Sequence, residues 1–505
     1  MANNEQQLNQ DVAPKGERRP RPPIVVVMGH IDHGKTTLLD NIRKSHVAEK
    51  ESGGITQHVG AYEIEHHAKK ITFIDTPGHE AFSAMRSRSA KVADIAILVV
   101  AADEGVKAQT KEAISHIKNS GIDLIVAINK IDKPGADPEQ VKRELIKEEI
   151  LVESMAGKIP SVNVSALTGE GVANLLEMIL LVAEVQGITA DYNQPAQGVV
   201  IEAFMDSQRG ATATLLVKEG ILRKGDVIGT ASGFGKLMNL LNFQGKSIEQ
   251  ALPSMPAIVF GLEKIPRIGE EFKVFSCLEL AENCLKKVEE KIFLPATAEG
   301  VEKTVNLVVK ADFLGSVEAL KEVLKQLPQE KVTLNILKAE VGDVNESDVK
   351  LAKENNAKIF AFRVKTSPPI KNLAEREKVR IINCEIIYEI VEDVHKLMEK
   401  SVAPEIVRVD LGKLKVLMVF LIDKNRQIVG GKVTEGEVKR GAVFEIWRNE
   451  ELIGQAKIVN LQRNKKDADK VAKSEECGLL CEGDKKIEAD DILVFYTEER
   501  HKAEL

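Results

Sequence analysis

The residues best suited to chemistry form a glycine-rich segment near the start of the chain, from Gly29 to Thr36. Two glycines separated by four residues and followed by lysine and threonine match the phosphate-loop pattern. Glycines let the backbone curl so that its N–H groups point at phosphate oxygens. Lys35 supplies a positive charge for the β and γ phosphates, Thr36 offers a hydroxyl to Mg²⁺, and a helix starting at Thr37 adds its N-terminal dipole. The segment predicts a site for a nucleoside triphosphate and magnesium.

A second polar segment, Asp75 to His79, follows the apolar run Ile71 to Ile74. An aspartate at the carboxyl end of a second parallel strand is well placed to support the magnesium ion. Gly78 can bring its N–H close to a γ-phosphate, and His79 would then lie beside the attacking water. Taken alone, the same residues are equally typical of an Asp-Thr-Pro-Gly turn.

A third segment, Asn129 to Asp132, follows the run Leu124 to Ile128. The Asp132 carboxylate can accept hydrogen bonds from guanine N1–H and N2–H₂, a donor pair that adenine lacks, and an unpaired buried carboxylate would penalise the wrong base. Asn129 and Lys130 would brace this loop. Ser165 to Leu167, after the next strand, can offer a backbone N–H to the guanine oxygen. Three motifs in this order on successive strands predict a guanine nucleotide site.

A glycine-rich segment, Glu51 to His58, lies between the first two motifs. Thr56 in it could close on Mg²⁺ when the γ-phosphate is present, which is how a nucleotide switch orders and releases a loop. The expected metal ligands are Thr36, Thr56 and Asp75. The expected catalytic residues are His79, Lys35, Thr36, Asp75, Thr56 and Gly78. The expected nucleotide-binding residues are Gly29, His30, Ile31, Asp32, His33, Gly34, Lys35, Thr36, Thr37, Asp75, Thr76, Pro77, Gly78, His79, Asn129, Lys130, Ile131, Asp132, Ser165, Ala166 and Leu167.

Two histidine pairs raise the alternative of a bound transition metal. His30 and His33 lie in the phosphate loop, where the sequence shows no third ligand and a divalent ion would compete with the phosphates. We interpret His66 and His67 as a solvated turn. The five cysteines form no C-x-x-C pair, so neither a cysteine zinc site nor a disulfide framework is indicated.

The first part of the chain alternates short apolar runs with helical patterns, which predicts a mostly parallel, doubly wound sheet. The expected strands are Ile24 to Met28, Ile71 to Ile74, Ile95 to Val100, Leu124 to Ile128 and Ser161 to Val164. The expected helices are Thr37 to Lys50, Glu80 to Val92, Thr110 to Asn119, Pro138 to Glu153 and Val172 to Val185.

A chain of 505 residues is long enough for several domains. The order of its predicted strands and helices indicates a multidomain α/β protein with β-barrels. Two regions of strands and turns follow the first α/β unit, and a second α/β unit separates them. The expected parts are a disordered tail (1–23), a P-loop GTP-binding domain (24–190), a β-barrel (196–285), an α/β domain (300–385), a linker helix (386–402) and a C-terminal β-barrel (404–505). We also expect a helix from Leu278 to Ile292.

Composition excludes several classes of protein. With 70 basic and 77 acidic residues the formal net charge is −7, so contact with RNA must be local. Aromatic residues are 4% of the chain, which argues against a sheet of base-stacking rings. The eight-residue apolar run Ile95 to Ala102 is too short to cross a bilayer, and residues 1–23 lack the apolar core of a signal peptide. We therefore expect a cytoplasmic protein.

The phosphate loop and the Asp75 to His79 segment resemble those of the translational GTPases, since most other small GTPases carry glutamine where His79 stands. Further blocks resemble the bacterial translation initiation factor 2 family, and the resemblance spans about residues 23 to 500. These blocks are Gly198 to Ala203, Gly315 to Leu320, Glu346 to Val349 and Glu476 to Gly478.

The resemblance implies a factor that uses GTP/GDP and Mg²⁺, brings formylmethionyl initiator tRNA to the small ribosomal subunit, promotes joining of the large subunit and then hydrolyses GTP. It implies that ribosomal RNA docks His79, that Asp32 helps to place a monovalent ion, and that Ile31 and Ile55 form an apolar gate. The isolated protein, which we expect to be a monomer, would then be a slow GTPase. The C-terminal barrel would hold the formylmethionine and the tRNA acceptor end.

The chain departs from the family at one element of the C-terminal barrel, because Gly431 stands where relatives often have cysteine. A basic cluster that includes Arg463 is interpreted equally well as a tRNA contact or as a solvated turn. Three rival functions remain: an elongation-type factor, which the α/β block after the first barrel disfavours, a scaffold that binds GTP without hydrolysing it, and an ATP-dependent enzyme.

Overall fold

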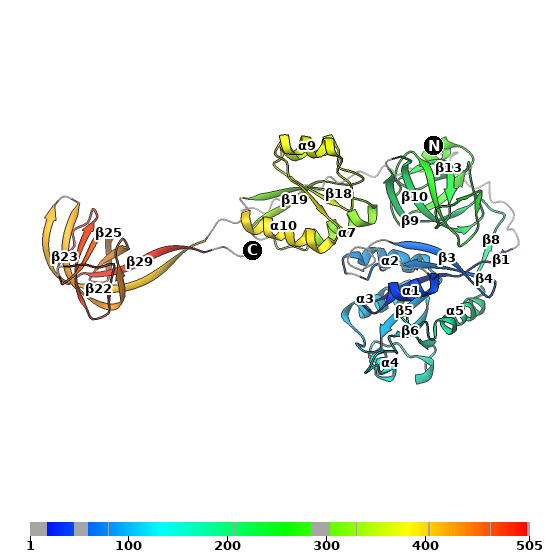
Figure 1. The fold of residues 1–505 in the computed structure, drawn as a ribbon, viewed down its shortest axis with the longest axis horizontal. Helices are drawn as coiled ribbons and strands as arrows, with labels where there is room; N and C mark the ends of the chain where they lie inside the picture. The colour runs from blue at the N-terminus through cyan, green and yellow to red at the C-terminus, as the bar shows by residue number, and fades with distance from the viewer. Residues whose placement is uncertain are drawn as a thin grey trace, which may run out of the picture. The chain divides into compact units, whose positions relative to one another are not determined.

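The computed structural model describes residues 18–44, 59–78, 80–206, 208–283, 303–329, 331–401, 405–423, 425–464 and 466–501. It contains two compact units, Met1–Met398 and Glu399–Leu505, which are described separately below. The predicted fold class, a P-loop α/β domain with further α/β and β-barrel parts, is confirmed (Figure 1).

The first domain is built on a six-stranded sheet in the order β3-β4-β2-β5-β6-β7. Every pairing is parallel except that of β3 with β4. The central strands are almost continuously apolar because helices cover both faces of the sheet. The strands are β2 (Ile24–Gly29), β3 (Gly60–His66), β4 (Lys69–Asp75), β5 (Ile95–Ala101), β6 (Asp123–Asn129) and β7 (Ser161–Asn163).

The helices of this domain follow the strands closely. They are α1 (Lys35–Arg43), η2 (Glu80–Phe82), α2 (Ser83–Val92), α3 (Ala108–Ser120), α4 (Pro138–Lys147), η3 (Glu153–Met155) and α5 (Val172–Gln186). The expectation of a helix from Pro138 to Glu153 was wrong at its end. Glu149 has φ 63°, a left-handed conformation that a right-handed helix cannot continue through.

The start of the described chain is more ordered than expected. A disordered tail was predicted for residues 1–23, but β1 (Arg18–Pro20) pairs antiparallel with β8 (Thr189–Asp191). Ion pairs hold the segment in place, from Arg18 to Glu219 at 2.8 Å and from Arg21 to Asp94 at 2.7 Å. Residues 1–17 lie outside the described residues.

The second domain is a closed barrel in the order β12-β17-β9-β10-β16-β13, with β12 and β13 completing the ring. Closure leaves none of these strands with an unpaired edge. The strands are β9 (Gln197–Asp206), β10 (Gly210–Glu219), β12 (Val227–Gly229), β13 (Phe234–Leu241), β16 (Pro256–Leu262) and β17 (Glu271–Phe275), with short pairings from β11 (Leu222–Arg223), β14 (Ser247–Ile248) and β15 (Gln250–Ala251). The helix expected from Leu278 to Ile292 is described only as α6 (Leu278–Glu282), because 284–302 lie outside the described residues.

The third domain has a four-stranded parallel sheet in the order β19-β18-β20-β21. Its elements are β18 (Thr304–Ala311), α7 (Leu314–Lys325), β19 (Thr333–Val341), α8 (Glu346–Glu354), β20 (Lys358–Phe362), α9 (Pro368–Arg376), β21 (Ile381–Cys384) and α10 (Ile387–Ser401). The linker helix expected at 386–402 is α10, and it buries Ile387, Ile390, Val394 and Met398 on one face. In the part of the chain that the structure describes, no helix is long and apolar enough to cross a membrane.

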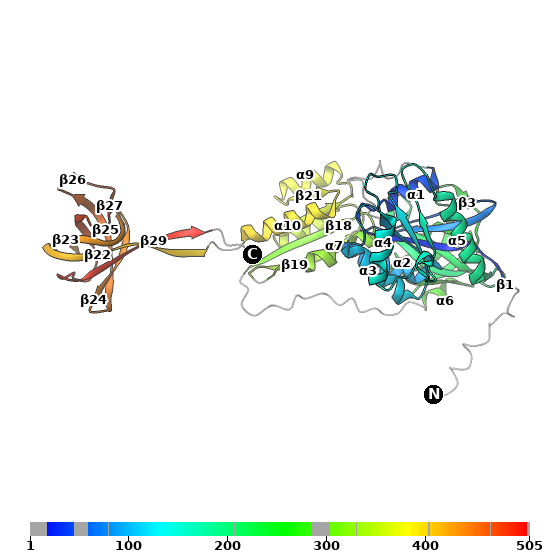
Figure 2. The ribbon, with the colours of Figure 1, turned by 90° about the horizontal axis from the view of Figure 1, so that it is seen from below.

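The second unit is another closed barrel, in the order β22-β29-β24-β25-β28-β23 with β23 returning to β22. The strands are β22 (Glu405–Asp423), β23 (Arg426–Lys439), β24 (Val443–Arg448), β25 (Glu451–Arg463), β28 (Glu476–Glu482) and β29 (Ile492–His501), with β26 (Lys466–Asp467) and β27 (Lys470–Ala472) added. The paired ends of β22 and β29 project from the barrel as a two-stranded ribbon (Figure 2).

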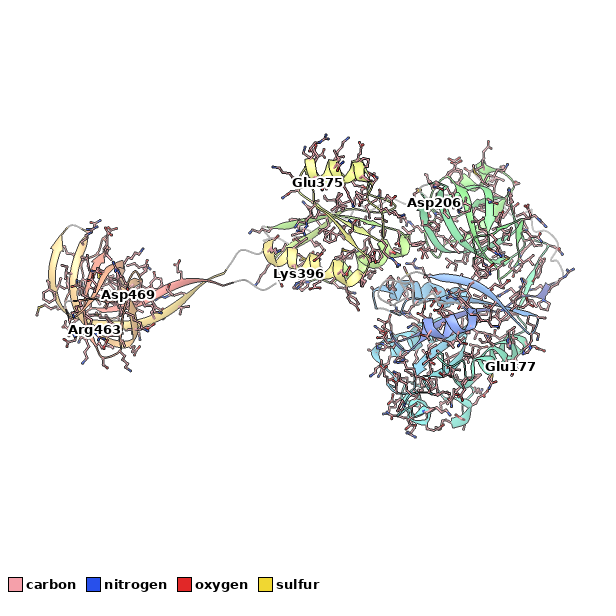
Figure 3. The ribbon with its side chains drawn as sticks, viewed as in Figure 1. Glu177, Asp206, Glu375, Lys396, Arg463 and Asp469 are labelled. Carbon is pink, nitrogen blue, oxygen red and sulfur yellow. The ribbon has the colours of Figure 1, made fainter. Side chains whose placement is uncertain are left out.

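Two features of this barrel bear on function. Gly431 lies opposite Cys477 of β28, and a Cβ at Gly431 would lie 2.2 Å from a methyl carbon of Leu414. The barrel therefore has no room for a cysteine side chain there, while a buried thiol sits across the ladder. Arg463, labelled in Figure 3, forms an ion pair with Glu475 at 2.7 Å, so part of the basic cluster is already neutralised.

Candidate nucleotide-binding site

The phosphate loop connects β2 to α1, and its two glycines are required by its shape. Gly29 has φ +147°, and a Cβ there would lie 2.3 Å from the carbonyl oxygen of Val99 on β5. Gly34 has φ +86°, and a Cβ there would lie 2.3 Å from Asn129 Nδ2. Helix α1 begins immediately after Gly34, so the positive N-terminal end of its dipole faces the loop. The loop has the form of an anion-binding site.

Lys35 lies inside this loop. Its Nζ donates hydrogen bonds to the carbonyl oxygens of Gly29, at 2.9 Å, and His30, at 2.6 Å. Burial lowers the pKa of Lys35 to about 8, against the opposing attraction of Asp75. A triphosphate entering the loop would supply the negative charge that a buried ammonium group lacks.

This depressed pKa predicts how nucleotide affinity changes with pH. A bound phosphate raises the pKa of Lys35, because it stabilises the protonated ammonium group. Nucleotide affinity is therefore highest below pH 8, and it falls as pH rises through 8 by at most about tenfold per pH unit. The affinity for GDP, measured between about pH 7 and pH 9, tests this dependence, since that range begins below the pKa of Lys35 in the nucleotide-free chain. Constant affinity across the range would contradict the charge assigned to Lys35.

The second motif runs beside Lys35. Thr76 Oγ1 donates to the carbonyl oxygen of Val27 at 2.8 Å, which ties the start of the loop to β2. A Cβ at Gly78 would lie 2.4 Å from Lys35 Nζ, so a residue with a side chain at this position would crowd the ammonium group. Arg86 on α2 supports the loop by donating to Pro77 O at 3.1 Å. His79 and Thr56 lie outside the described residues.

The residues present fit a magnesium ion. Mg²⁺ prefers hard oxygen ligands; Thr36, in the first turn of α1, supplies a hydroxyl, and Asp75, at the end of β4, supplies a carboxylate. Asp75 is buried, and Arg43 lies 3.4 Å from one of its oxygens. Asp75 also lies near enough to raise the pKa of Lys35, so carboxylate and ammonium share one electrostatic environment.

His30 and His33 support the loop through packing. Their rings meet edge to face with centroids 4.9 Å apart, and Ile31 N donates to Gln109 Oε1 at 2.9 Å. Burial lowers the pKa of His33 to about 4, so this ring is neutral at physiological pH. No third metal ligand joins this pair among the residues that the structure describes.

Asn129 joins three loops at the carboxyl edge of the sheet. Its buried side chain donates from Nδ2 to His33 O in the phosphate loop at 2.8 Å. Its Oδ1 accepts from Ala166 N at 2.8 Å. Lys130 follows with φ 63° and forms an ion pair with Glu104 at 2.8 Å. The phosphate loop, the Asn129–Asp132 loop and the Ser165–Leu167 loop therefore form one continuous surface.

Replacing Asn129 by alanine tests this joint. The change leaves His33 O and Ala166 N buried without their partners, which costs about 2 kcal/mol, or about 30-fold in Kd for GDP. Equilibrium binding of a fluorescent GDP analogue measures the loss. Asn163→Ala, at an exposed position on β7, is the matched control and should bind normally. Equal affinity of the two variants would refute the bridging role.

The third and fourth motifs also meet directly. Ser165 Oγ donates to Asp132 Oδ1 at 2.5 Å, and Thr168 N donates to Ser165 Oγ at 3.1 Å. The Asp132 residue is exposed, and Leu167 beside this loop is 76% exposed. An oriented carboxylate and an uncovered apolar side chain thus lie at one end of the surface, with Lys35 at the other.

Comparisons with known proteins identify the family of this chain. Residues 21–184 match the family model for the elongation factor Tu GTP binding domain, 195–275 match elongation factor G domain 2, and 281–395 match translation-initiation factor 2. Translation initiation factor IF-2 of Halothermothrix orenii is 44% identical over 492 residues, covering 94% of this chain and 72% of that protein. The chain belongs to the translation initiation factor IF-2 family.

Other members of the IF-2 family are longer. The factor from Carboxydothermus hydrogenoformans is 44% identical over 96% of this chain, which spans 61% of that protein. The factor from Pelotomaculum thermopropionicum is 43% identical, and this chain spans 51% of it. The solved structure of GDP-bound aIF5B from Aeropyrum pernix is 27% identical, covering 94% of this chain and 92% of that one at a TM-score of 0.46.

Sequence reasoning missed the residues that support the IF-2 loops from other elements. Gln109 holds the phosphate loop, Arg86 holds the second motif and Glu104 pairs with Lys130. Glu112 in turn binds Arg86 at 2.7 Å, and although burial raises the pKa of Glu112, hydrogen bonds from His116, Ser83 and Arg86 hold it at about 2. No local sequence pattern indicates these residues, because each contacts a loop that only the folded chain brings next to it.

Proposed function

We propose that this chain is a GTP-dependent translation initiation factor that acts in the cytoplasm as a monomer. It recruits formylmethionyl initiator tRNA to the small ribosomal subunit, promotes joining of the large subunit and hydrolyses GTP on the ribosome, contacting ribosomal RNA. Membership of the IF-2 family supports this proposal. The observation that carries it is the Asn129 bridge, which joins the loop suited to phosphates to the loop suited to a purine.

In this proposal the nucleotide lies along the surface that these loops form. The phosphates occupy the curve from Gly29 to Thr36, with Lys35 donating to the β and γ oxygens. The guanine base lies against Leu167, which it covers, and its N1–H and N2–H₂ donate to Asp132. The hydrogen bond from Ser165 fixes the rotamer of that carboxylate before the base arrives. The resulting pocket selects guanine over adenine.

Hydrolysis is in-line attack of water on the γ-phosphate. Lys35, the backbone N–H groups of the phosphate loop and the N–H of Gly78 stabilise the charge that develops on the equatorial oxygens. Magnesium, held by Thr36, Asp75 and Thr56, would supply further neutralisation of that charge when bound. His79 orients the water, and the ribosome places His79, so the free protein retains GTP and hydrolysis acts as a timer.

The C-terminal barrel is proposed to hold the formylmethionine and the acceptor end of the tRNA. Four basic residues of the described cluster, Arg463, Lys466, Lys470 and Lys473, lie on and around its β25, β26 and β27 strands. We also propose the domain division given above: 24–190, 196–285, 300–385, 386–402 and 404–505. The matched family models, at 21–184, 195–275 and 281–395, follow the same order as the first three of these parts, which supports the proposed division.

The test is phosphate release from GTP by the chain alone, with each ribosomal subunit, and with both subunits carrying formylated initiator tRNA. We expect slow release alone and strong stimulation in the complete assembly. Replacing the initiator tRNA by an aminoacylated elongator tRNA is the control, and a preference for the elongator would favour an elongation-type factor. Absence of stimulation in the complete assembly would favour a scaffold that does not hydrolyse GTP.

A further inference from the structure

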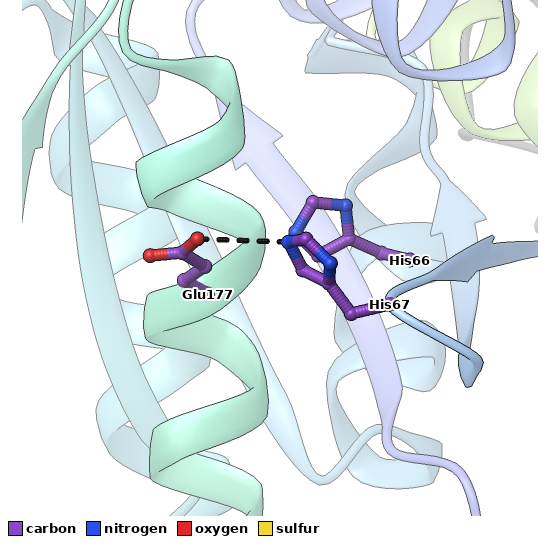
Figure 4. Close-up of side chains that lie close together, drawn as sticks. All are labelled: His66, His67 and Glu177. Carbon is purple, nitrogen blue, oxygen red and sulfur yellow. Dashed lines mark ion pairs between the residues drawn. The ribbon is translucent and has the colours of Figure 1, made fainter.

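A group of potential metal ligands lies on the GTP-binding domain, away from the phosphate loop. His66 ends β3, His67 lies in the following turn and Glu177 lies on α5 (Figure 4). One ligand atom from each residue lies within 4.8 Å of the other two, and His67 Nε2 is 3.7 Å from Glu177 Oε1. The two imidazole rings have centroids 4.2 Å apart. Two imidazoles and a carboxylate, from segments more than 100 residues apart, thus converge.

The turn between β3 and β4 explains why neighbouring histidines face the same side. Consecutive side chains on a straight strand point to opposite faces of the sheet. Here His66 pairs with Lys69, and the two residues between them, His67 and Ala68, have φ 48° and 58°. This is the left-handed two-residue hairpin turn that asparagine and glycine prefer, and it brings the His67 ring beside that of His66.

An exposed ion pair also joins the two elements that carry the ligands. Lys69, the first residue of β4, forms an ion pair with Glu184 on α5 at 3.2 Å, two turns along from Glu177. His67 and Glu177 are well exposed, with side-chain exposures of 71% and 62%, so both can rotate to shorten the ligand distances.

One atom of the group lacks a partner in the structure. His66 Nε2 is shielded from solvent and has no hydrogen-bond partner among the described residues. A shielded polar atom without a partner is unfavourable, and such atoms are often satisfied by a water molecule or an ion. The unpartnered Nε2 of His66 is therefore a second observation in favour of a bound ion, beside the convergence of the three ligand residues.

We propose that His66, His67 and Glu177 bind a zinc ion. Zinc in proteins accepts imidazole nitrogen and carboxylate oxygen, and a site with three protein ligands completes its tetrahedron with water. Mg²⁺ and Ca²⁺ prefer oxygen ligands and are disfavoured here. The ion would link the β3–β4 hairpin, whose second strand leads to Asp75, to α5, which follows the loop of Ser165. Its role is to stabilise this side of the GTP-binding domain.

The test uses Co²⁺ as a spectroscopic substitute for zinc on the full chain, with GDP and excess Mg²⁺ present to occupy the nucleotide site. We expect one equivalent of Co²⁺ to give the visible absorption of a site with four or five ligands including nitrogen, and Zn²⁺ to abolish it. His66→Ala and Glu177→Gln should each weaken Co²⁺ binding by at least about tenfold. Lys69→Ala, which removes the Glu184 ion pair but no ligand, should keep the absorption.

Thermal unfolding gives a second readout. Zn²⁺ should raise the unfolding temperature of the unsubstituted chain and of Lys69→Ala, and should not raise that of Glu177→Gln. Glu177 is exposed on a helix surface, so its glutamine variant folds even if His66→Ala does not. An absence of Co²⁺ absorption, or the same absorption in His66→Ala and Glu177→Gln, would overturn the proposal, the second outcome by placing the metal elsewhere.

Discussion

Replacing Asp132 by asparagine should reverse the base preference of the pocket. A carboxylate accepts from both guanine donors, whereas the new amide presents an N–H₂ group that clashes with guanine N2–H₂ and can donate to the oxygen that xanthine carries there. Sites built to hydrogen-bond a particular group discriminate by about 10⁴-fold, and we expect a change of that order in the ratio of GTP to XTP affinity. The Ser165 hydroxyl can still hold the new side chain, since it can donate to the amide oxygen.

Equilibrium competition against a fluorescent guanine nucleotide measures this ratio. Asp137→Asn is the matched control, because Asp137 caps α4 by accepting from Gln140 N at 2.9 Å and asparagine caps equally well. The control should keep the original preference. If Asp132→Asn binds GTP as tightly as the unsubstituted chain, Asp132 does not contact the base. If ATP competes as well as GTP for the unsubstituted chain, the protein is instead an ATP-dependent enzyme.

Replacing His79 by alanine should leave GTP binding intact and remove hydrolysis stimulated by the ribosome, with a loss of about 10²- to 10⁴-fold. The physical reason lies in its neighbour. A Cβ at Gly78, the residue before His79, would lie 2.4 Å from Lys35 Nζ, the ammonium group proposed to hold the γ-phosphate. The proposed role of His79 is to orient the water that attacks this phosphate.

Single-turnover phosphate release on ribosomes carrying initiator tRNA measures the effect of His79→Ala. His395→Ala, on α10 of another domain, is the control and should be stimulated normally. Turnover of His79→Ala at the unsubstituted rate would remove His79 from the mechanism. Loss of GTP affinity in the same variant would mean that His79 supports binding instead.

The parts of the fold that could be predicted from the sequence are those whose structure depends on residues adjacent in the chain. The central strands could be recognised because burial on both faces makes them continuously apolar, and the phosphate loop because its glycines and lysine are adjacent in the chain. Strand β3 was missed: it is an edge strand of mixed polarity whose register depends on its partner β4. β1 was missed because it is a strand only through its pairing with β8, and these two three-residue segments, 18–20 and 189–191, lie far apart in the sequence.

The same distinction holds for the candidate site. The residues of each motif are adjacent in the chain, so the chemistry of phosphates and guanine is enough to propose them from the sequence, and they stay a prediction. The bridge from Asn129 to His33 spans 96 residues, and nothing near Asn129 in the sequence indicates its partner. Glu177 is likewise one of two carboxylates on α5, and only the hairpin turn brings His66 and His67 to it.

The most direct test of the central claim is a crystal structure of the chain with a non-hydrolysable GTP analogue and Mg²⁺. The account predicts the triphosphate in the loop from Gly29 to Thr36 with Lys35 on the β and γ oxygens, and the guanine edge on Asp132 with Leu167 covered. A nucleotide bound elsewhere, or one whose base lies away from Asp132 while its phosphates contact Lys35, would contradict it.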